Sequence, residues 1–461
     1  MHCTLRFKRY SMKSFLFGLV FRLIVEVING KYPIGSDANT YYILKYLHPN
    51  LIEELQDGFI YEYLMLGIAK LIGNIFITIK FLSCLISGLL VLSLYLWGSK
   101  NGLEEKHAYE FSIVAFMYFT TLEISWDLHR NALALAFALI SLSIYSEKRK
   151  TSYLLAVLSG LTHPFTIFIF GGVLIFSVFK GKIGKILLLL CNVFAVAFII
   201  YCRIYLSQKS VSNLLIASQQ SWHVPPYLMP VFYLWITLPL ISIFIVCVYL
   251  KRSNIGILME NKQNLGWILV SLLASPMFIF GYRILLMAVI PLIFFTYVSS
   301  KDTNRKLLKT LFVICLASGC TYQPLIYLYP AYPGFRHATG VLTIGGTMAP
   351  WDTKNAEELF KYAITLLNED ICLIVHHSEI SIAYAAGVNL MEKNIIVASG
   401  PLGPVTEFDE YLQLALNNYS IALIIWYINP PVGSVDIPKE PDYTCKTLSV
   451  LGNMALYRYT K

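Results

Sequence analysis

Long apolar runs, separated by loops that are alternately basic, constrain this chain more than any other feature. Runs long enough to cross a bilayer when tilted number about eleven. They cover roughly residues 14–30, 75–97, 109–123, 131–146, 152–163, 164–179, 184–206, 227–250, 264–281, 283–299 and 307–328. Only 14% of the residues are charged, against about 25% in a soluble domain. We therefore expect a polytopic α-helical membrane protein.

The basic loops predict the orientation. Lysine and arginine gather in the leader and in every second loop, at residues 100–106, 148–150, 180–185, 251–262 and 301–309. Such loops stay in the cytoplasm, and an odd number of spans then places the C-terminal tail outside the cell. We expect a multi-pass protein of the plasma membrane. No small-residue cleavage site follows the first run, so we interpret this run as a retained helix and not as a signal peptide.

The tail after residue 330 has a different pattern. It contains no spanning run, and short apolar strands alternate with helical stretches, as in an α/β domain. We predict a membrane domain over residues 1–330 and an extracytoplasmic α/β domain over residues 331–461. The expected strands are Gly340–Ile344, Ile371–His376, Asn394–Ala398 and Ile421–Trp426, the expected helices are Asn355–Leu367, Glu379–Ala386 and Glu407–Asn417, and a hairpin is expected over Thr447–Tyr459.

The cysteines do not predict a metal site. They are scattered singly, without a CxxC pair, so neither zinc binding nor a disulfide scaffold is supported. Cys372 and Cys445 both lie in the polar tail and could pair if that tail is outside the cell.

Ionisable residues at the outer ends of the expected helices are the candidate functional residues. In the predicted topology the acids Asp37, Glu123 and Asp127 share this face with Arg130, His163 and Arg283. Singly, each is explained by helix capping or by snorkelling to the interface. Together they favour one outward-facing site, because carboxylates can take a proton from a hydroxyl and arginines can clamp a phosphate. A phosphate that carries a sugar at a membrane surface is a polyprenyl-phosphate donor.

Several neighbouring features complete this picture. Tyr41, Tyr42, Trp222 and His223 lie in outer loops that could contact a substrate. The stretch 59–72 has apolar residues at helical spacing and is expected to lie on the membrane surface. Lys80 and Glu26 lie near helix ends and are expected to snorkel. His376 ends an expected strand, where a solvated loop position is favoured over a role in acceptor binding.

Four stretches resemble the GT-C-fold glycosyltransferases, the multi-spanning class that uses lipid-phosphate-linked sugars, mannosyltransferases among them. They are Gly35-Ser36-Asp37-Ala38 with Tyr41-Tyr42, the helix from Ile79 to Tyr95, Trp126-Asp127-Leu128-His129-Arg130 leading to Leu161-Thr162-His163-Pro164, and Tyr282-Arg283 followed by Ile290-Pro291. The resemblance covers most of the chain through short, loose motifs.

The resemblance implies roles for the candidate residues. Asp37 would be the catalytic base or the carboxylate that orients the acceptor, and Asp127 the second acid, with Glu123 as the weaker choice. Arg130, His163 and Arg283 would face the donor phosphate. The second loop has one aspartate where the family has an adjacent acidic pair, so no cofactor is assigned, and a divalent metal is an open possibility that the residues do not support. The expected partners are a polyprenyl-phosphate sugar and a glycan, lipid or protein acceptor, not nucleic acid.

Two alternatives stay open. Arg130 followed by a helix, a basic loop and His163 is similar to the pattern of Wzy/EpsG-like polysaccharide polymerases, which usually lack an α/β tail. A membrane transporter belongs to a different class, and charges buried within helices would favour it.

Overall fold

The computed structural model describes residues 9–28, 30–35, 41–47, 59–126, 128–179, 182–207, 228–251, 254–277, 281–328, 350–376, 379–398, 408–428 and 444–460. Its contacts divide the chain into two compact units. The first consists of Met1–Ile28 and Asn50–Tyr322, and the second of Asn29–Pro49 and Gln323–Lys461. The boundary predicted at residue 330 lies outside the described residues. Residues 29–49, which we assigned to the membrane domain, group with the tail.

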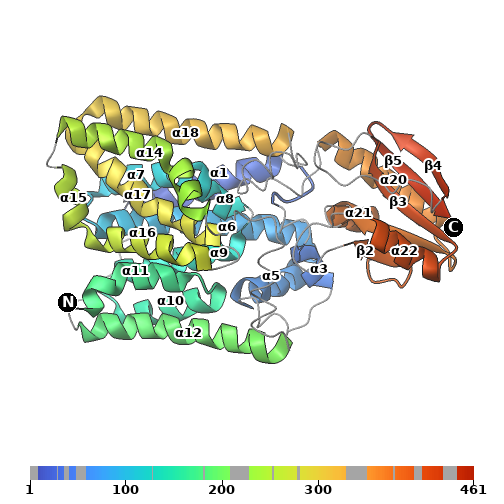
Figure 1. Ribbon diagram of the computed structural model, residues 1–461, viewed down its shortest axis with the longest axis horizontal. Coiled ribbons are helices and arrows are strands. Elements are labelled where there is room, and N and C mark those ends of the chain that lie inside the picture. Colours follow the sequence, from blue (N-terminus) through green and yellow to red (C-terminus); the bar gives the residue numbers. More distant parts are fainter. Residues whose placement is uncertain are drawn as a thin grey trace. The chain divides into compact units, whose positions relative to one another are not determined.

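The first unit is helical (Figure 1). Its helices are α1 (Arg9–Ile28), α5 (Phe59–Ile72), α6 (Ile75–Lys100), α7 (Glu105–Met117), α8 (Phe119–Trp126), α9 (His129–Ile144), α10 (Arg149–Thr162), α11 (Thr166–Val178), α12 (Ile183–Ser207), α14 (Met229–Leu250), α15 (Asn254–Glu260), α16 (Lys262–Ala274), the 3₁₀ turn η2 (Ser275–Met277), α17 (Gly281–Thr303) and α18 (Arg305–Leu328). By length and composition, α6, α14 and the stretches Ile183–Cys202 and Arg283–Thr303 are able to cross a membrane. The chain is therefore a helical membrane protein, and the full count of about eleven spans stays a prediction.

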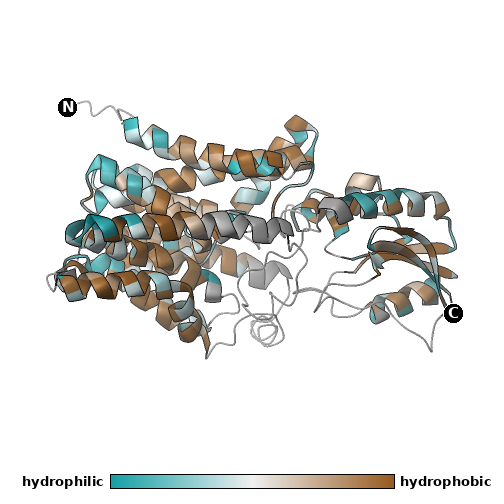
Figure 2. Ribbon diagram, turned by 90° about the horizontal axis from the view of Figure 1, so that it is seen from above, coloured by the Kyte–Doolittle hydropathy of each residue, from teal (hydrophilic) through white to brown (hydrophobic). Residues whose placement is uncertain are grey.

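The spanning helices differ in how deeply they lie within the unit. In the most apolar 18-residue stretch of each helix, 67% of α6 and 83% of α17 is buried, whereas only 28% of α12 and 39% of α14 is buried. The outer pair exposes large apolar side chains, among them Phe194, Phe198 and Trp235, and hydrophobic helix surfaces are visible throughout this unit in Figure 2. Because exposed apolar area on this scale is unusual in water, α12 and α14 are suited to face lipid.

Close packing of α1 against α6 fixes the geometry of the polar site described below. A Cβ atom added at Gly18 would collide with the carbonyl oxygen of Ser87, so the two backbones approach closely where a side chain is missing. Small residues allow this approach between helices in a membrane. The two helices run antiparallel, and the last turns of α1 therefore lie beside the first turns of α6.

One expected span is interrupted. The run predicted over residues 109–123 forms two helices, α7 and α8, with Tyr118 between them in an extended conformation. The Tyr118 hydroxyl donates a hydrogen bond to the carbonyl oxygen of Ile236 on α14 at 2.5 Å. The apolar pattern continues through the break, so hydrophobicity alone did not reveal it.

The second unit contains a five-stranded sheet of order β2-β1-β3-β5-β4. Its strands are β1 (Ile371–His376), β2 (Ile395–Ala398), β3 (Ile421–Tyr427), β4 (Thr444–Leu451) and β5 (Met454–Thr460). Strand β1 pairs in parallel with β2 and β3, while β5 is antiparallel to β3 and β4. Four expected segments are confirmed as strands: β1 at its predicted bounds, β2, β3 and the terminal hairpin, which turns at Gly452 with φ of 58°. The strand expected at residues 340–344 lies outside the described residues.

Helices cover both faces of this sheet, as Figure 2 shows. The expected helices are confirmed as α20 (Pro350–Leu366), α21 (Ile380–Ala386) and α22 (Asp409–Asn418). The chain moves from β1 through α21 to β2, then back through α22 to β3 on the other side of β1. Right-handed crossovers in opposite directions place α21 and α22 on opposite faces.

The segment 30–35 is bound to α20 through Glu357. The carboxylate accepts hydrogen bonds from the Lys31 amino group at 3.1 Å and from the Tyr32 hydroxyl at 2.8 Å, and it pairs with Lys361 at 2.9 Å. Ile34 is buried, and α3 (Tyr41–Leu47) contacts α21. Part of the segment that follows α1 is thus an element of the C-terminal unit.

The Glu357 carboxylate should make stability depend on acidity. Burial alone would raise its pKa, but hydrogen bonds from Lys361, Tyr32 and Lys31 outweigh this effect and hold the pKa at about 2. A depressed pKa stabilises the folded state above the ordinary carboxyl pKa of 4.5, and this stability is lost as the pH falls toward about 2. The thermal midpoint of Glu357→Gln should therefore lie below that of the wild type at pH 7, and the gap should close as the pH falls toward 2. A gap that does not change with pH would contradict this assignment.

Cys372 and Cys445 do not pair. Both are free, Cys372 on β1 and Cys445 on β4. Strands β3 and β5 lie between them in the sheet, which separates their side chains by more than a disulfide can bridge. Burial raises the pKa of the Cys372 thiol to about 12, so this cysteine is an inert part of the core.

Candidate functional site

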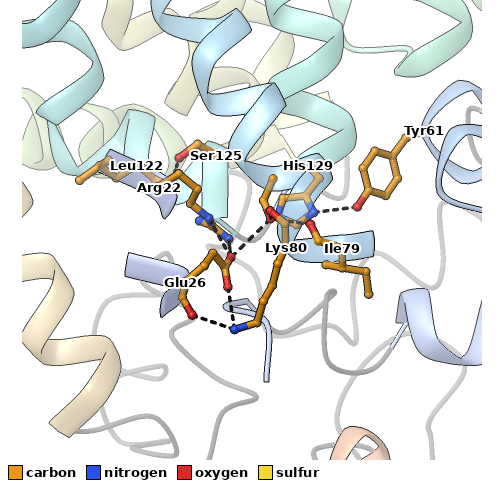
Figure 3. Close-up of polar contacts among 9 residues, drawn as sticks. Arg22, Glu26, Tyr61, Ile79, Lys80, Leu122, Ser125 and His129 are labelled. Atoms are coloured by element: carbon orange, nitrogen blue, oxygen red, sulfur yellow. Dashed lines mark hydrogen bonds and ion pairs between the residues drawn. The ribbon is translucent and has the colours of Figure 1, made fainter. Parts of the chain in front are cut away.

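A buried ion pair lies at the C-terminal end of α1 (Figure 3). The guanidinium of Arg22 contacts Oε1 of Glu26 with Nη2 at 2.6 Å and with Nε at 2.9 Å. The two residues are one helical turn apart, which places them on one face of the helix. Arg22 is 0% exposed and Glu26 is 2% exposed. The expectation that Glu26 snorkels is wrong, because α6 covers this face of α1.

Helix α6 adds a second cation and a hydroxyl to the same carboxylate. The Lys80 amino group donates to the backbone oxygen of Glu26 at 2.7 Å and lies 3.7 Å from Oε2 of that residue. The Ser83 hydroxyl lies 3.4 Å from Oε1 of Glu26 and 2.6 Å from the carbonyl oxygen of Ile79. Two cations therefore contact one acid.

A second polar group joins α5 to α9. Nη1 of Arg130 lies 3.2 Å from Oε1 of Glu62. The hydroxyl of Tyr61 lies 2.9 Å from Nδ1 of His129. Tyr61, Glu62 and His129 are fully buried, and Arg130 retains 16% of its side-chain exposure. Helix α5 is therefore not a simple surface helix, because Tyr61 and Glu62 pack into the bundle, whereas Lys70 stays exposed.

Both groups lie at one end of the bundle. Arg22 and Glu26 are in the last turns of α1, while the other members come from the first turns of α5, α6 and α9. Helix α6 packs against both α1 and α9, and Figure 3 shows Arg22, Glu26 and Lys80 close to the Tyr61–His129 pair. We call this set the polar cluster. It consists of Arg22, Glu26, Tyr61, Glu62, Lys80, Ser83, His129 and Arg130.

The cluster holds three cationic side chains against two carboxylates. Arg22, Lys80 and Arg130 lie in apolar surroundings where charge is costly unless it is paired. Grouped guanidinium and ammonium groups of this kind are suited to contact a phosphate or another anion. The described residues contain no group of histidine, cysteine and acid side chains able to hold a metal ion.

The predicted site residues have different outcomes. Arg130 belongs to the polar cluster. His163 caps the end of α10, is 8% exposed, and accepts a hydrogen bond at Nδ1 from the Phe165 backbone at 3.3 Å. Arg283 lies half-buried in the first turn of α17. These three positions are at helix ends, as expected, and their approach to a common phosphate stays a prediction.

The remaining candidates fall elsewhere. Tyr41 and Tyr42 lie on α3 in the second unit, with ring centroids 5.5 Å apart, and Tyr42 is fully buried in that unit. Glu123 is in α8, and its side chain is not among those described. Asp37, Asp127, Trp222 and His223 lie outside the described residues, so their proposed roles rest on the sequence.

Most residues of the polar cluster were not predicted from the sequence to form a site. Arg22 and Glu26 could have been predicted, because opposite charges four residues apart inside an apolar run indicate an ion pair on the helix face that points into the bundle. His129 was part of a quoted motif but was not selected. Lys80 was noted with Glu26 but was expected to snorkel. Tyr61 and Glu62 were not selected, because their partners are far away in the sequence.

The comparisons with known proteins give no family. No protein-family model matches the chain, and no curated protein is significantly similar to it. The fold and the cluster define it as a helical membrane protein with charged groups buried at one end of its bundle.

Proposed function

We propose that this protein is a glycosyltransferase, a hexosyltransferase that moves a sugar from a polyprenyl-phosphate donor to an acceptor hydroxyl at the outer membrane face. The observation that carries the proposal is that three cationic side chains, Arg22, Lys80 and Arg130, gather in the polar cluster at one end of a helical membrane bundle. Forked guanidinium groups suit a phosphate, and an apolar bundle suits a polyprenyl chain. We include in this proposal that the fold is of the GT-C class and that the α/β domain lies outside the cell.

In the proposed step, a glycosyl group moves from the lipid phosphate to the acceptor hydroxyl. The acceptor oxygen attacks the anomeric carbon, its proton passes to the carboxylate of Asp37, and the bond from that carbon to the phosphate oxygen breaks. The lipid phosphate leaves with the electron pair, and cationic side chains stabilise its charge. Arg130, His163 and Arg283 are the proposed phosphate ligands, and Asp127 is the proposed second carboxylate.

Arg130 offers the most direct test. With the protein reconstituted in vesicles containing a radiolabelled polyprenyl-phosphate sugar, Arg130→Ala should raise the KM for the lipid donor by about tenfold or more. Arg130→Lys should keep the positive charge next to Glu62 but lose the forked donor geometry of the guanidinium. Its KM for the lipid donor should therefore lie between those of the wild type and Arg130→Ala. The exposed Lys262 on α16 is the matched control, and Lys262→Ala should not change the KM. Equal effects on donor and acceptor would argue against a phosphate ligand.

One observation favours a transporter as the second candidate. The Arg22–Glu26 pair is buried within an apolar helix, and buried charges in membrane segments often mark ion or proton pathways. A transporter would move solute across the vesicle membrane and form no glycosyl product. The polymerase alternative would form long glycan products in the same assay.

A further inference from the structure

Ionisable side chains outside the polar cluster differ in how far they are covered. His376 is covered, because its ring lies 4.5 Å from the ring of Trp426 between centroids and the residue is only 4% exposed. The solvated-loop position expected for His376 is therefore wrong. A group of lysines in the membrane unit is more open. Lys100 ends α6 and Lys182 precedes α12, and both are exposed, while Lys185 lies half-buried in the first turn of α12.

Side-chain contacts bring these lysines to one place. The amino group of Lys100 donates a hydrogen bond to the hydroxyl of Ser146, just after α9, at 2.5 Å. The residue before this serine is Tyr145, and a Cβ atom added at Gly184 would collide with the Tyr145 hydroxyl. The end of α9 therefore touches the start of α12 directly before Lys185. The ends of α6 and α9 and the start of α12 meet at this point.

The lysines repel one another and are not paired with acids. Lys182 and Lys100 both act on the charge of Lys185 by electrostatic repulsion. Arg149 begins α10, which packs beside α12 (Figure 1), and its guanidinium lies 5.9 Å from the ring centre of Tyr145. Within the described part of the chain, no carboxylate forms an ion pair with any of these four cations. We call Lys100, Arg149, Lys182 and Lys185 the basic patch, and a bound anion would relieve the repulsion within it.

The basic patch and the polar cluster lie toward opposite ends of α6. Lys80 is near the start of this helix and Lys100 is its last residue, which separates them by about 30 Å along the axis at about 1.5 Å per residue. The hydrocarbon core of a bilayer is also about 30 Å thick. Helix α6 is therefore long enough to place the polar cluster at one membrane surface and the basic patch among the lipid headgroups of the other.

An exposed apolar stripe on α12 begins at the basic patch. Its members recur every three or four residues, which places them on one face of the helix, and they are 40–81% exposed. They are Ile183, Leu187, Leu190, Phe194 and Phe198. The stripe is about 22 Å long at about 1.5 Å per residue, which exceeds the roughly 15 Å depth of one leaflet. Its first residue directly follows Lys182, so charged and apolar surfaces are continuous here.

We propose that the basic patch and the α12 stripe bind one anionic phospholipid, with the headgroup phosphate on the lysines and the acyl chains along the helix. An ammonium group has three donors. Lys100 and Lys185 each use one on a serine hydroxyl, Lys185 on Ser177 at 3.2 Å, which leaves donors for phosphate oxygens. Basic sites between membrane helices bind acidic lipid headgroups in this way. The stripe favours a lipid over free phosphate, and the proposal goes beyond the transferase and does not depend on it.

Binding is measured on the full chain in a neutral detergent, by native mass spectrometry with titration of phosphatidylglycerol. Phosphatidylcholine with the same acyl chains has no net charge and should bind at least about tenfold more weakly. Replacing Lys100, Lys182 and Lys185 together with glutamine should weaken phosphatidylglycerol binding by more than about twentyfold, because each cation at an anionic headgroup contributes about fivefold. Phosphatidylglycerol should also raise the thermal midpoint of the wild type more than that of this triple variant.

The matched control replaces three exposed cations of α18, Arg305, Lys306 and Lys309, with glutamine. It loses the same formal charge and should keep phosphatidylglycerol binding within about twofold. An equal loss in both triple variants would show that only net charge attracts the lipid, and this would overturn the site. Equal binding of the two lipids by the wild type would overturn it as well. So would displacement of phosphatidylglycerol by an equal concentration of glycerol phosphate, which lacks acyl chains.

A single substitution keeps the proposal testable if the triple variant does not fold. Lys182 is exposed and precedes α12, so Lys182→Gln should fold and should weaken phosphatidylglycerol binding by about fivefold. Unchanged binding in this variant would contradict the site. Arg130→Ala separates this proposal from the transferase proposal, because it should impair transfer and leave phosphatidylglycerol binding unchanged.

Discussion

Replacing Glu26 with alanine should destabilise the protein by about 3–5 kcal/mol, because it removes the carboxylate that both Arg22 and Lys80 contact in an apolar bundle. The carboxylate contacts both cations and Ser83. Thermal or denaturant unfolding of the purified protein in detergent measures the loss. We expect this to be the largest stability effect of any single substitution in the polar cluster.

Two variants make this expectation specific. Glu104 precedes α7, is exposed and makes no capping hydrogen bond, so Glu104→Ala should change stability by less than about 0.5 kcal/mol. Replacing Arg22 and Glu26 together with methionine and leucine removes both charges of the pair and should recover part of the loss. An unfolding midpoint of Glu26→Ala equal to that of the wild type would show that the carboxylate does not stabilise the cluster.

Replacing Asp37 with asparagine should lower sugar transfer by about 10²–10⁴-fold, because the amide has the same size but cannot accept the proton of the acceptor hydroxyl. Initial rates in reconstituted vesicles measure this loss, and an unchanged thermal midpoint excludes a folding defect. Asp57 lies in the same loop of the sequence, and Asp57→Asn should retain full activity. Full transfer by Asp37→Asn would remove this residue from the proposed mechanism.

The strands of the α/β unit could be predicted from the sequence because local chemistry defines them. The run from Ile371 to His376 is apolar and rich in β-branched residues, and β1 has these same bounds. Gly452 supplies the positive φ that the terminal hairpin requires. The helices around these strands were also located to within a few residues.

The polar cluster could not be predicted in the same way, because its members meet through tertiary packing. Lys80 and Glu26 are 54 residues apart, and Tyr61 and His129 are 68 apart. A helical pattern shows which residues share a face but not what covers that face. Our expectation for Glu26 therefore assigned its charge to the membrane surface, although the unit buries it.

The bond between Lys31 and Glu357 imposes an order on biosynthesis. The two residues are 326 positions apart, and at roughly 5–20 residues per second about 16–65 s of translation separate them. During this interval the intervening apolar helices are synthesised and enter the membrane, and residues 30–35 have no C-terminal unit to bind. We expect a nascent chain stopped before α20 to leave residues 30–35 open to protease, and completion of the last strands to protect them.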